Sequence, residues 1–157
     1  MNGSDSKAKQ YALRLLSYRG RSEKEMAERL RKRGVSDAAA SSTVNSLKRA
    51  GLIDDLSLAE SLKREALVNK VLSRSGARHF MLGRGIPKGI IDKILRDDEN
   101  TDYDNARRFV DKRLRMLGRY PEITAKRRLY NQLLRRGYSA ETIIKVLREK
   151  NMKEEDQ

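Results

Sequence analysis

The chain contains no cysteine, no tryptophan and a single histidine, His79. Without cysteine it cannot form a disulfide framework or a thiolate metal site, and one histidine cannot make a histidine-rich metal site. The same absences remove the usual pairing of a nucleophile with a histidine base. We therefore expect no enzymatic activity, no catalytic residue, no metal and no cofactor.

Long apolar stretches are also missing. No run of apolar residues is long enough to cross a bilayer, and residues 1–10 are polar and lack the apolar core of a signal peptide. Only two prolines and 5% aromatic residues accompany many Leu, Ala, Arg, Lys and Glu residues. This composition is typical of helical proteins, so it predicts a soluble, cytoplasmic, all-α chain.

A short motif occurs three times along the chain. Each copy has an arginine, a glycine, an apolar residue and a residue that suits a helix start, and the glycines are 51 and 52 positions apart. The copies are Arg33-Gly34-Val35-Ser36, Arg84-Gly85-Ile86-Pro87 and Arg136-Gly137-Tyr138-Ser139. Repetition at a fixed period indicates one supersecondary unit that is used several times and stacked into an extended body.

The motif divides the chain into three parts of three helices each. We expect three tandem three-helix-bundle repeats that form an elongated, curved molecule, at residues 8–54, 55–100 and 101–151, followed by a frayed tail at residues 152–157. The acidic run at residues 97–100 is the expected linker before the third repeat.

Helix boundaries are marked most clearly in the first repeat. Ser22 and Glu25 have the spacing of a capping box, in which each side chain accepts a hydrogen bond from the other residue's backbone amide. Gly34 is the expected left-handed residue that ends this helix, and Ser36 is expected to cap the next one.

The second repeat carries weaker boundary signals. We expect Asp55 to cap a helix that runs to about Leu72. The residues expected on its apolar side are Leu56, Ala59, Leu62, Ala66 and Val71. Ser75 is the expected start of the next, shorter helix.

The charge of the chain is strongly positive. Lys and Arg number 36 against 22 Asp and Glu, which gives a formal net charge of +14. Residues 1–54 carry 12 basic and 6 acidic side chains, residues 55–100 carry 9 and 7, and residues 101–157 carry 15 and 9. Such a surface favours polyanions, with nucleic acid first and an anionic membrane second. The two ends are expected to meet the polyanion first, and the middle is expected to pack against the rest of the chain or to meet a protein instead.

Clustered basic residues are the main candidates for contacts with that polyanion. A single arginine is more often part of a solvated, salt-bridged helix face, but the unbalanced charge of the whole set favours an interface. The six tyrosines could stack on bases, although their positions on apolar stripes favour partial burial. The candidate binding residues are Arg31, Lys32, Arg33, Arg78, Arg84, Arg107, Arg108, Arg127, Arg128, Arg135 and Arg136.

A second group of residues has a structural interpretation. In Gly51-Leu52-Ile53-Asp54-Asp55 the glycine stops a helix and the acids stand at the start of the next, where negative charge complements the helix dipole. A catalytic or metal-binding carboxylate pair is the less favoured alternative, because no third ligand lies at suitable spacing. Gly76 suits the close approach of a neighbouring helix or of a phosphate. The structural motif residues are Gly51, Asp54, Asp55, Gly76, Gly85 and Gly137.

Several of these motifs, taken in order, resemble the RecX family of regulators of the bacterial RecA recombinase. Residues 51–55 are similar to the family's element of glycine, an aromatic or apolar residue, Leu, Asp and Asp, which joins its first and second modules. Residues 76–86 and residues 133–139 resemble its second- and third-module patterns, and residues 15–30 fit its first module. Leu58, Ser75 and Pro87 stand where the family usually has other residues.

The resemblance covers about residues 8–150 and implies a function. RecX proteins are not enzymes; they bind the RecA–DNA filament along its groove and inhibit strand exchange and filament growth. The resemblance thus implies a modulator, mainly an inhibitor, of RecA that also binds single- and double-stranded DNA directly. A monomer is the default expectation for its oligomeric state.

Two alternatives remain open from the sequence. The first is an independent architectural DNA-binding protein, since three-helix modules are common DNA readers. The second is an amphipathic protein on an anionic membrane, although its charge is spread over several short helices.

Overall fold

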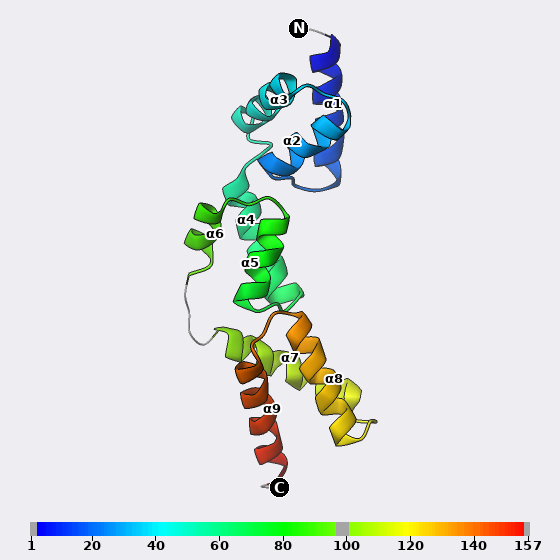
Figure 1. Ribbon diagram of the computed structural model, residues 1–157, viewed down its shortest axis with the longest axis vertical. Helices are drawn as coiled ribbons and strands as arrows, with labels where there is room; N and C mark the ends of the chain where they lie inside the picture. The colour runs from blue at the N-terminus through cyan, green and yellow to red at the C-terminus, as the bar shows by residue number, and fades with distance from the viewer. Residues whose placement is uncertain (1–2, 97–100, 156–157) are drawn as a thin grey trace. The chain divides into compact units, whose positions relative to one another are not determined.

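A computed structural model describes residues 3–96 and 101–155, with side chains described as far as Lys150 (Figure 1). The described residues form α-helices and one π-helical turn, with no strand, which confirms the expected all-α fold. The expected linker at residues 97–100 lies outside the described residues. The elements are α1 (Gly3–Tyr18), α2 (Glu23–Lys32), α3 (Asp37–Arg49), α4 (Asp55–Arg64), η1 (Glu65–Asn69), α5 (Arg74–Gly83), α6 (Lys88–Ile94), α7 (Thr101–Leu117), α8 (Glu122–Arg135) and α9 (Ala140–Glu155).

Backbone contacts divide the chain into two compact units. The first unit comprises Met1–Leu62 and Met81–Ile94, and the second comprises Lys63–Phe80 and Leu95–Gln157. The residues of the expected middle repeat are thus shared between the units. The division into repeats at residues 54 and 100, like the elongated, curved shape, stays a prediction.

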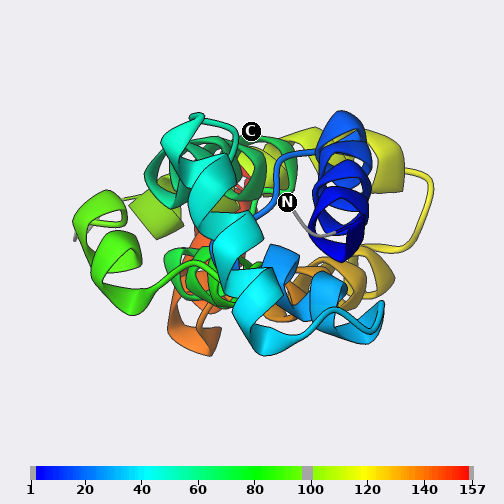
Figure 2. The same ribbon diagram turned by 90° about the horizontal axis from the view of Figure 1, so that it is seen from above.

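Helices α1, α2 and α3 form a bundle in the first unit, drawn blue to cyan in Figures 1 and 2. Its core contains Met26, Leu30 and Leu47, which are fully buried, together with Ala8, Ala12 and Ile53. Each large apolar side chain buried in this way contributes about 1.5–3 kcal/mol. Apolar residues at helical spacing on each helix therefore hold the bundle together.

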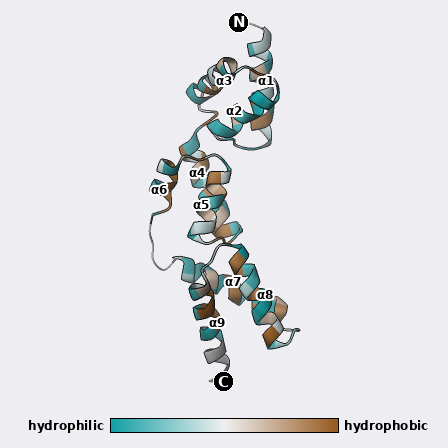
Figure 3. Ribbon diagram, in the orientation of Figure 1, coloured by the Kyte–Doolittle hydropathy of each residue, from teal (hydrophilic) through white to brown (hydrophobic). Residues whose placement is uncertain are grey.

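Helices α7, α8 and α9 form a second bundle in the second unit. Brown hydrophobic segments alternate with teal hydrophilic ones along these helices in Figure 3, as expected of helices with one buried face. The core contains Val110, Leu129, Leu133, Ile143 and Val146. Tyr138, the apolar residue of the third motif copy, is also buried there and is 3% exposed.

The helix boundaries expected from the repeated motif are confirmed. Ser22 and Glu25 form the capping box at the start of α2, and Ser36 accepts a hydrogen bond from the amide of Ala39 at the start of α3. The three motif glycines and Gly51 all have left-handed backbone conformations, with φ between 75° and 94°. Glycine adopts this conformation without the steric cost that other residues bear.

The boundaries expected around the fourth helix were wrong in part. Asp54, not Asp55, caps α4, because its Oδ1 accepts hydrogen bonds from the amides of Leu56 and Ser57 at 3.1 and 3.2 Å. Leu56 is 49% exposed and does not belong to the apolar face. The α-helix ends at Arg64, earlier in the sequence than the expected Leu72, and continues as the π-helical turn η1.

Two further boundaries differ from expectation. Ser73, not Ser75, caps α5, because its Oγ accepts a hydrogen bond from the amide of Gly76 at 2.9 Å. Val71, expected on the apolar side of a helix, has a left-handed φ of 51° between η1 and α5. At the other end of the chain, α9 ends at Glu155, and the fraying expected of residues 152–157 stays a prediction.

Candidate nucleic-acid interface

The basic residues that end α2 lie on the surface of the first unit. Lys32 and Arg33 are exposed, and Arg31 forms an ion pair with Asp37 across the turn to α3, with Nε and Oδ1 3.0 Å apart. The guanidinium of Arg33 lies 4.5 Å from the ring centroid of Tyr11. This stacking orients Arg33 without cancelling its charge, and no carboxylate in the described part of the chain forms an ion pair with it.

Arg84 lies in a different environment from the other candidate residues. Its Nε donates a hydrogen bond to Glu25 Oε2 at 3.0 Å, and its Nη2 donates to the carbonyl of Gly20 at 2.9 Å. The side chains of Arg84 and Glu25 are only 14% and 16% exposed. The structure therefore gives Arg84 an internal role, and we do not include it in the interface proposed below.

Most candidates in the second unit are exposed. Arg107 and Arg108 lie on the outer surface of α7, and Arg127, Arg128 and Arg135 lie on that of α8. Arg128 stacks over the ring of Tyr120, with 4.4 Å between its guanidinium carbon and the ring centroid, and Arg108 donates to the side-chain carbonyl of Asn105. Three further cations close to these residues in the sequence are also exposed, namely Lys112, Arg115 and Arg119.

Arg78 and Arg136 are partly buried. Arg136 follows α8, where its guanidinium lies 4.5 Å from the ring centroid of Phe109 and its Nη1 donates to the carbonyl of Gln132 at 3.2 Å. Burial, together with the charge of Arg113, lowers the pKa of Arg136. These contacts leave the side chain of Arg136 less conformational freedom than the exposed arginines have.

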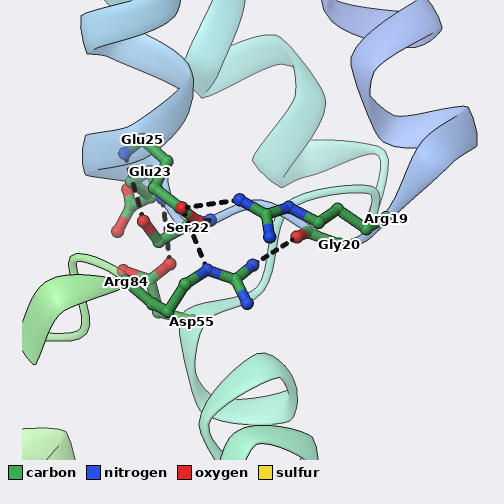
Figure 4. Close-up of polar contacts among 7 residues, drawn as sticks. All are labelled: Arg19, Gly20, Ser22, Glu23, Glu25, Asp55 and Arg84. Atoms are coloured by element: carbon green, nitrogen blue, oxygen red, sulfur yellow. Dashed lines mark hydrogen bonds and ion pairs between the residues drawn. The ribbon is translucent and has the colours of Figure 1, made fainter. Parts of the chain in front are cut away.

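Four of the structural motif residues, Asp55, Gly76, Gly85 and Gly137, lie at two junctions between helices that are distant in the sequence. At the first junction, shown in Figure 4, Ser22 caps α2 and its own amide donates to Glu25 Oε1 at 3.1 Å. The amide of Glu23 donates to Oδ1 of the buried Asp55 at 3.0 Å. Gly85 lies against the cap, since a Cβ on this glycine would be 2.6 Å from Ser22 Oγ.

The second junction lies in the second unit and has the same construction. Ser73 caps α5, and the amide of Arg74 donates to Asp102 Oδ1 at 2.8 Å. A Cβ on Gly137 would lie 2.5 Å from Ser73 Oγ. Each junction thus joins a capping serine, a left-handed glycine after a later helix, and an aspartate at the start of the helix between them.

The pKa values of Asp54 and Asp55 are shifted in opposite directions. Burial raises the pKa of Asp55, against the amide of Glu23, which lowers it. The backbone amide and hydroxyl of Ser57 lower the pKa of the exposed Asp54. Both acids therefore serve backbone amides, which favours the structural interpretation of the pair. Residues 3–96 and 101–150 contain no group of three His, Asp or Glu side chains placed to hold a metal ion.

The fold and the surface together define a class of protein. It is an all-α chain of three-helix bundles whose junctions are built from repeated Ser, Gly and Asp residues and whose outer helices carry exposed cations. None of the helices in the described part of the chain is both long and apolar enough to traverse a membrane.

Comparison with known proteins identifies the family. The pattern of the first three-helix domain of RecX matches residues 8–47, and that of the third three-helix domain of RecX matches residues 100–147. The regulatory protein RecX of Amycolatopsis mediterranei is 32% identical over 88% of this chain and 82% of its own length. That of Chlorobium phaeobacteroides is 32% identical over 91% and 93%. The chain belongs to the RecX family.

A solved structure agrees in fold. The crystal structure of RecX from Lactobacillus salivarius superposes with a TM-score of 0.72 and covers 95% of this chain and 97% of its own, at 22% sequence identity. This likeness supports the all-α repeat architecture. The resemblance noted from the ordered motifs is thus confirmed at the level of the family and the fold.

Proposed function

We propose that this chain regulates a RecA-type recombinase, mainly as an inhibitor, by binding the recombinase–DNA filament and contacting DNA through exposed basic residues. The relatives it resembles bear the name regulatory protein RecX, and this supports a regulatory and non-enzymatic role. A cytoplasmic location and a monomeric state belong to the same proposal.

The proposal that the chain contacts DNA rests on the distribution of exposed cations on α7 and α8. Arg107, Arg127, Arg128 and Arg135 are exposed, and neighbouring carboxylates neutralise few of the charges on these two helices. Flexible, exposed cations of this kind bind phosphates without reading base sequence. The exposed Arg33 at the end of α2 extends the proposed contacts to the first unit.

RecA-driven strand exchange tests the regulatory part. With the wild-type chain present at amounts stoichiometric with RecA, we expect strand exchange to slow. Unchanged rates under those conditions would contradict the proposal.

Charge reversal tests the DNA part. Arg127→Glu with Arg128→Glu is expected to weaken binding to single-stranded DNA by about tenfold or more, because phosphate contacts become repulsive. Lys88→Glu with Lys93→Glu makes the same change in net charge on exposed positions of α6 and is the matched control. The melting temperature should change little in both variants. A sharp fall in melting only for the α8 pair would show that those arginines are structural.

A further inference from the structure

A cavity in the second unit is lined by a group of cations that the sequence did not bring together. It has a volume of about 470 Å³ and lies between the segment that follows η1, one side of α7 and the end of α8. Four of its lining residues are basic, namely Lys70, Lys112, Arg113 and Arg136, and no acidic residue of the described chain lines it. We call it the Phe109 cavity, after the aromatic residue in its wall.

Two of the cations around the Phe109 cavity are positioned by contacts with the Phe109 ring, and none of the four is neutralised by a carboxylate of the described residues. The guanidinium carbons of Arg113 and Arg136 lie 5.2 and 4.5 Å from the centroid of the Phe109 ring. A ring quadrupole orients a cation without cancelling its charge. Within the described residues, no carboxylate forms an ion pair with Lys70, Lys112 or either arginine. Like charges this close repel one another, so a bound anion would relieve the repulsion.

One wall of the cavity has an unusual backbone. Val71 is a β-branched residue in the left-handed region, with φ of 51°, two residues after the last residue of the π-helical turn η1. The hydroxyl of the buried Tyr138 donates to the carbonyl of Val71 at 2.9 Å and so fixes this conformation. Strained residues and π-helical turns occur preferentially at binding sites. Here the strained turn brings Lys70 to the same cavity as the α7 cations.

We infer that the Phe109 cavity binds a phosphodiester group of a nucleic-acid backbone. The inference rests on the proposed function, in which nucleic acid is a ligand of this chain. Arg113 offers a forked guanidinium for two phosphate oxygens, and Lys70 and Lys112 offer point charges from two different segments.

The surroundings indicate a backbone contact and not a base contact. Phe109 is 5% exposed and is covered by two guanidinium groups, so its ring is not open to a stacked base. A phosphate contact of this kind positions the nucleic acid without selecting its sequence. Nucleic acid is favoured over an acidic protein segment because the whole chain carries a net charge of +14, which attracts an extended polyanion.

Two paired substitutions test the inference. Lys70→Gln with Lys112→Gln removes two cavity charges, and Lys145→Gln with Arg148→Gln removes two charges from α9 residues that do not line the cavity. Affinity is measured by fluorescence anisotropy with a labelled thirty-nucleotide oligothymidylate over a range of salt concentrations. We expect the cavity pair to lose about tenfold in affinity and to reduce the log–log salt slope by about 1.4, or about 0.7 for each lost contact. The control pair should lose at most about threefold, with the slope unchanged.

Several results would overturn the inference. Equal losses for the two pairs would show that only overall charge matters, and an unchanged affinity of the cavity pair would exclude the cavity. A polyglutamate peptide that binds the wild type more tightly than the oligothymidylate, and loses its affinity in the cavity pair, would show a site for an acidic protein segment instead. Failure of the wild type to bind DNA would contradict the proposed function as well, whereas a cavity pair that binds DNA as tightly as the wild type contradicts this inference alone.

Discussion

The two junctions share a serine, a glycine and an aspartate but satisfy the amide of the capping serine in different ways. At the first junction, the amide of Ser22 donates to the side chain of Glu25, three residues further along the same helix. At the second, the amide of Ser73 donates to the backbone carbonyl of Arg136, at 3.0 Å. Gly76 has the same position in α5 that Glu25 has in α2, three residues after the capping serine. Because glycine has no side chain, the carbonyl of Arg136 can approach the helix.

This difference determines which contacts are made by the arginine that precedes each glycine, Arg84 before Gly85 and Arg136 before Gly137. Glu25 draws Arg84 into a buried ion pair, and Gly76 has no side chain that could hold Arg136 in the same way. The guanidinium of Arg136 instead lies over Phe109, in the wall of a cationic cavity. Identical Arg-Gly motifs therefore lead to an arginine in a buried ion pair in one unit and to an arginine in the wall of a cationic cavity in the other.

Alanine at the three motif glycines is expected to give the largest effects. Every site has a left-handed φ, which costs about 1–2 kcal/mol for a residue with a Cβ. At Gly137 the new Cβ would also lie 2.5 Å from Ser73 Oγ and 3.0 Å from backbone atoms of Gly76, which adds about 1–3 kcal/mol. Urea unfolding should rank Gly137→Ala and then Gly85→Ala as more destabilising than Gly34→Ala.

Gly34 is the internal control for this series. A Cβ built on it has no atom of the described residues within 4 Å, so Gly34→Ala reports the backbone cost alone. In addition, Ser73→Ala combined with Gly137→Ala should lose less than the two single changes added together. Equal losses at all three glycines would show that the junction contacts do not form.

Glu25→Ala is expected to destabilise the chain by about 2–3 kcal/mol, because it removes half of a capping box and leaves the mostly buried Arg84 without its carboxylate. Arg84→Ala and the double variant complete a double-mutant cycle in urea unfolding. We expect a coupling energy of about 1–2 kcal/mol. Additive effects would mean that Arg84 and Glu25 act independently.

Gly76→Ala tests whether the carbonyl of Arg136 approaches α5 closely at the second junction. Alanine in a helix is normally favoured over glycine by about 1 kcal/mol. At this position, however, its Cβ would lie 2.5 Å from the carbonyl oxygen of Arg136, and that oxygen belongs to the backbone and cannot swing away. We therefore expect a net loss of about 1–2 kcal/mol in unfolding free energy. A gain in stability would show that the carbonyl does not approach the helix.

The smallest effect concerns the two acids of the first junction. NMR titration of the side-chain carboxyl groups should place the pKa of Asp55 above 3.8 and that of Asp54 below it. A raised pKa means that the contribution of Asp55 to stability is full below its unfolded pKa and is lost as pH rises through the folded value. The contribution of Asp54 has the opposite sign, since it is lost as pH falls through its lowered pKa. Similar pKa values for the two groups would contradict the burial of Asp55.

Local signals in the sequence predicted much of this fold. The capping box of Ser22 and Glu25 and the left-handed glycines depend on residues a few positions apart. Each of these patterns depends only on contacts between neighbouring residues, which form in the same way in any fold. The structure confirms them. The role of Ser73 as the cap of α5 was missed, because its amide is satisfied by the distant carbonyl of Arg136.

The roles of individual arginines could not be predicted in the same way. Arg84 bonds Glu25, 59 residues away in the sequence, and no local pattern marks that partner. Lys70 was not a candidate, because the helical periodicity around it gave no sign of the π-helical turn or of the left-handed Val71. Basic clusters thus indicated the kind of ligand, and long-range contacts decide which cations remain free to meet it.

The most direct test of the account measures the affinity of the wild-type chain for two targets at one salt concentration. The targets are bare single-stranded DNA and the same DNA coated with RecA. A regulator of the recombinase filament should bind the coated DNA severalfold more tightly. Equal or weaker binding to the coated DNA would contradict the account and would indicate a DNA-binding protein that acts without the recombinase.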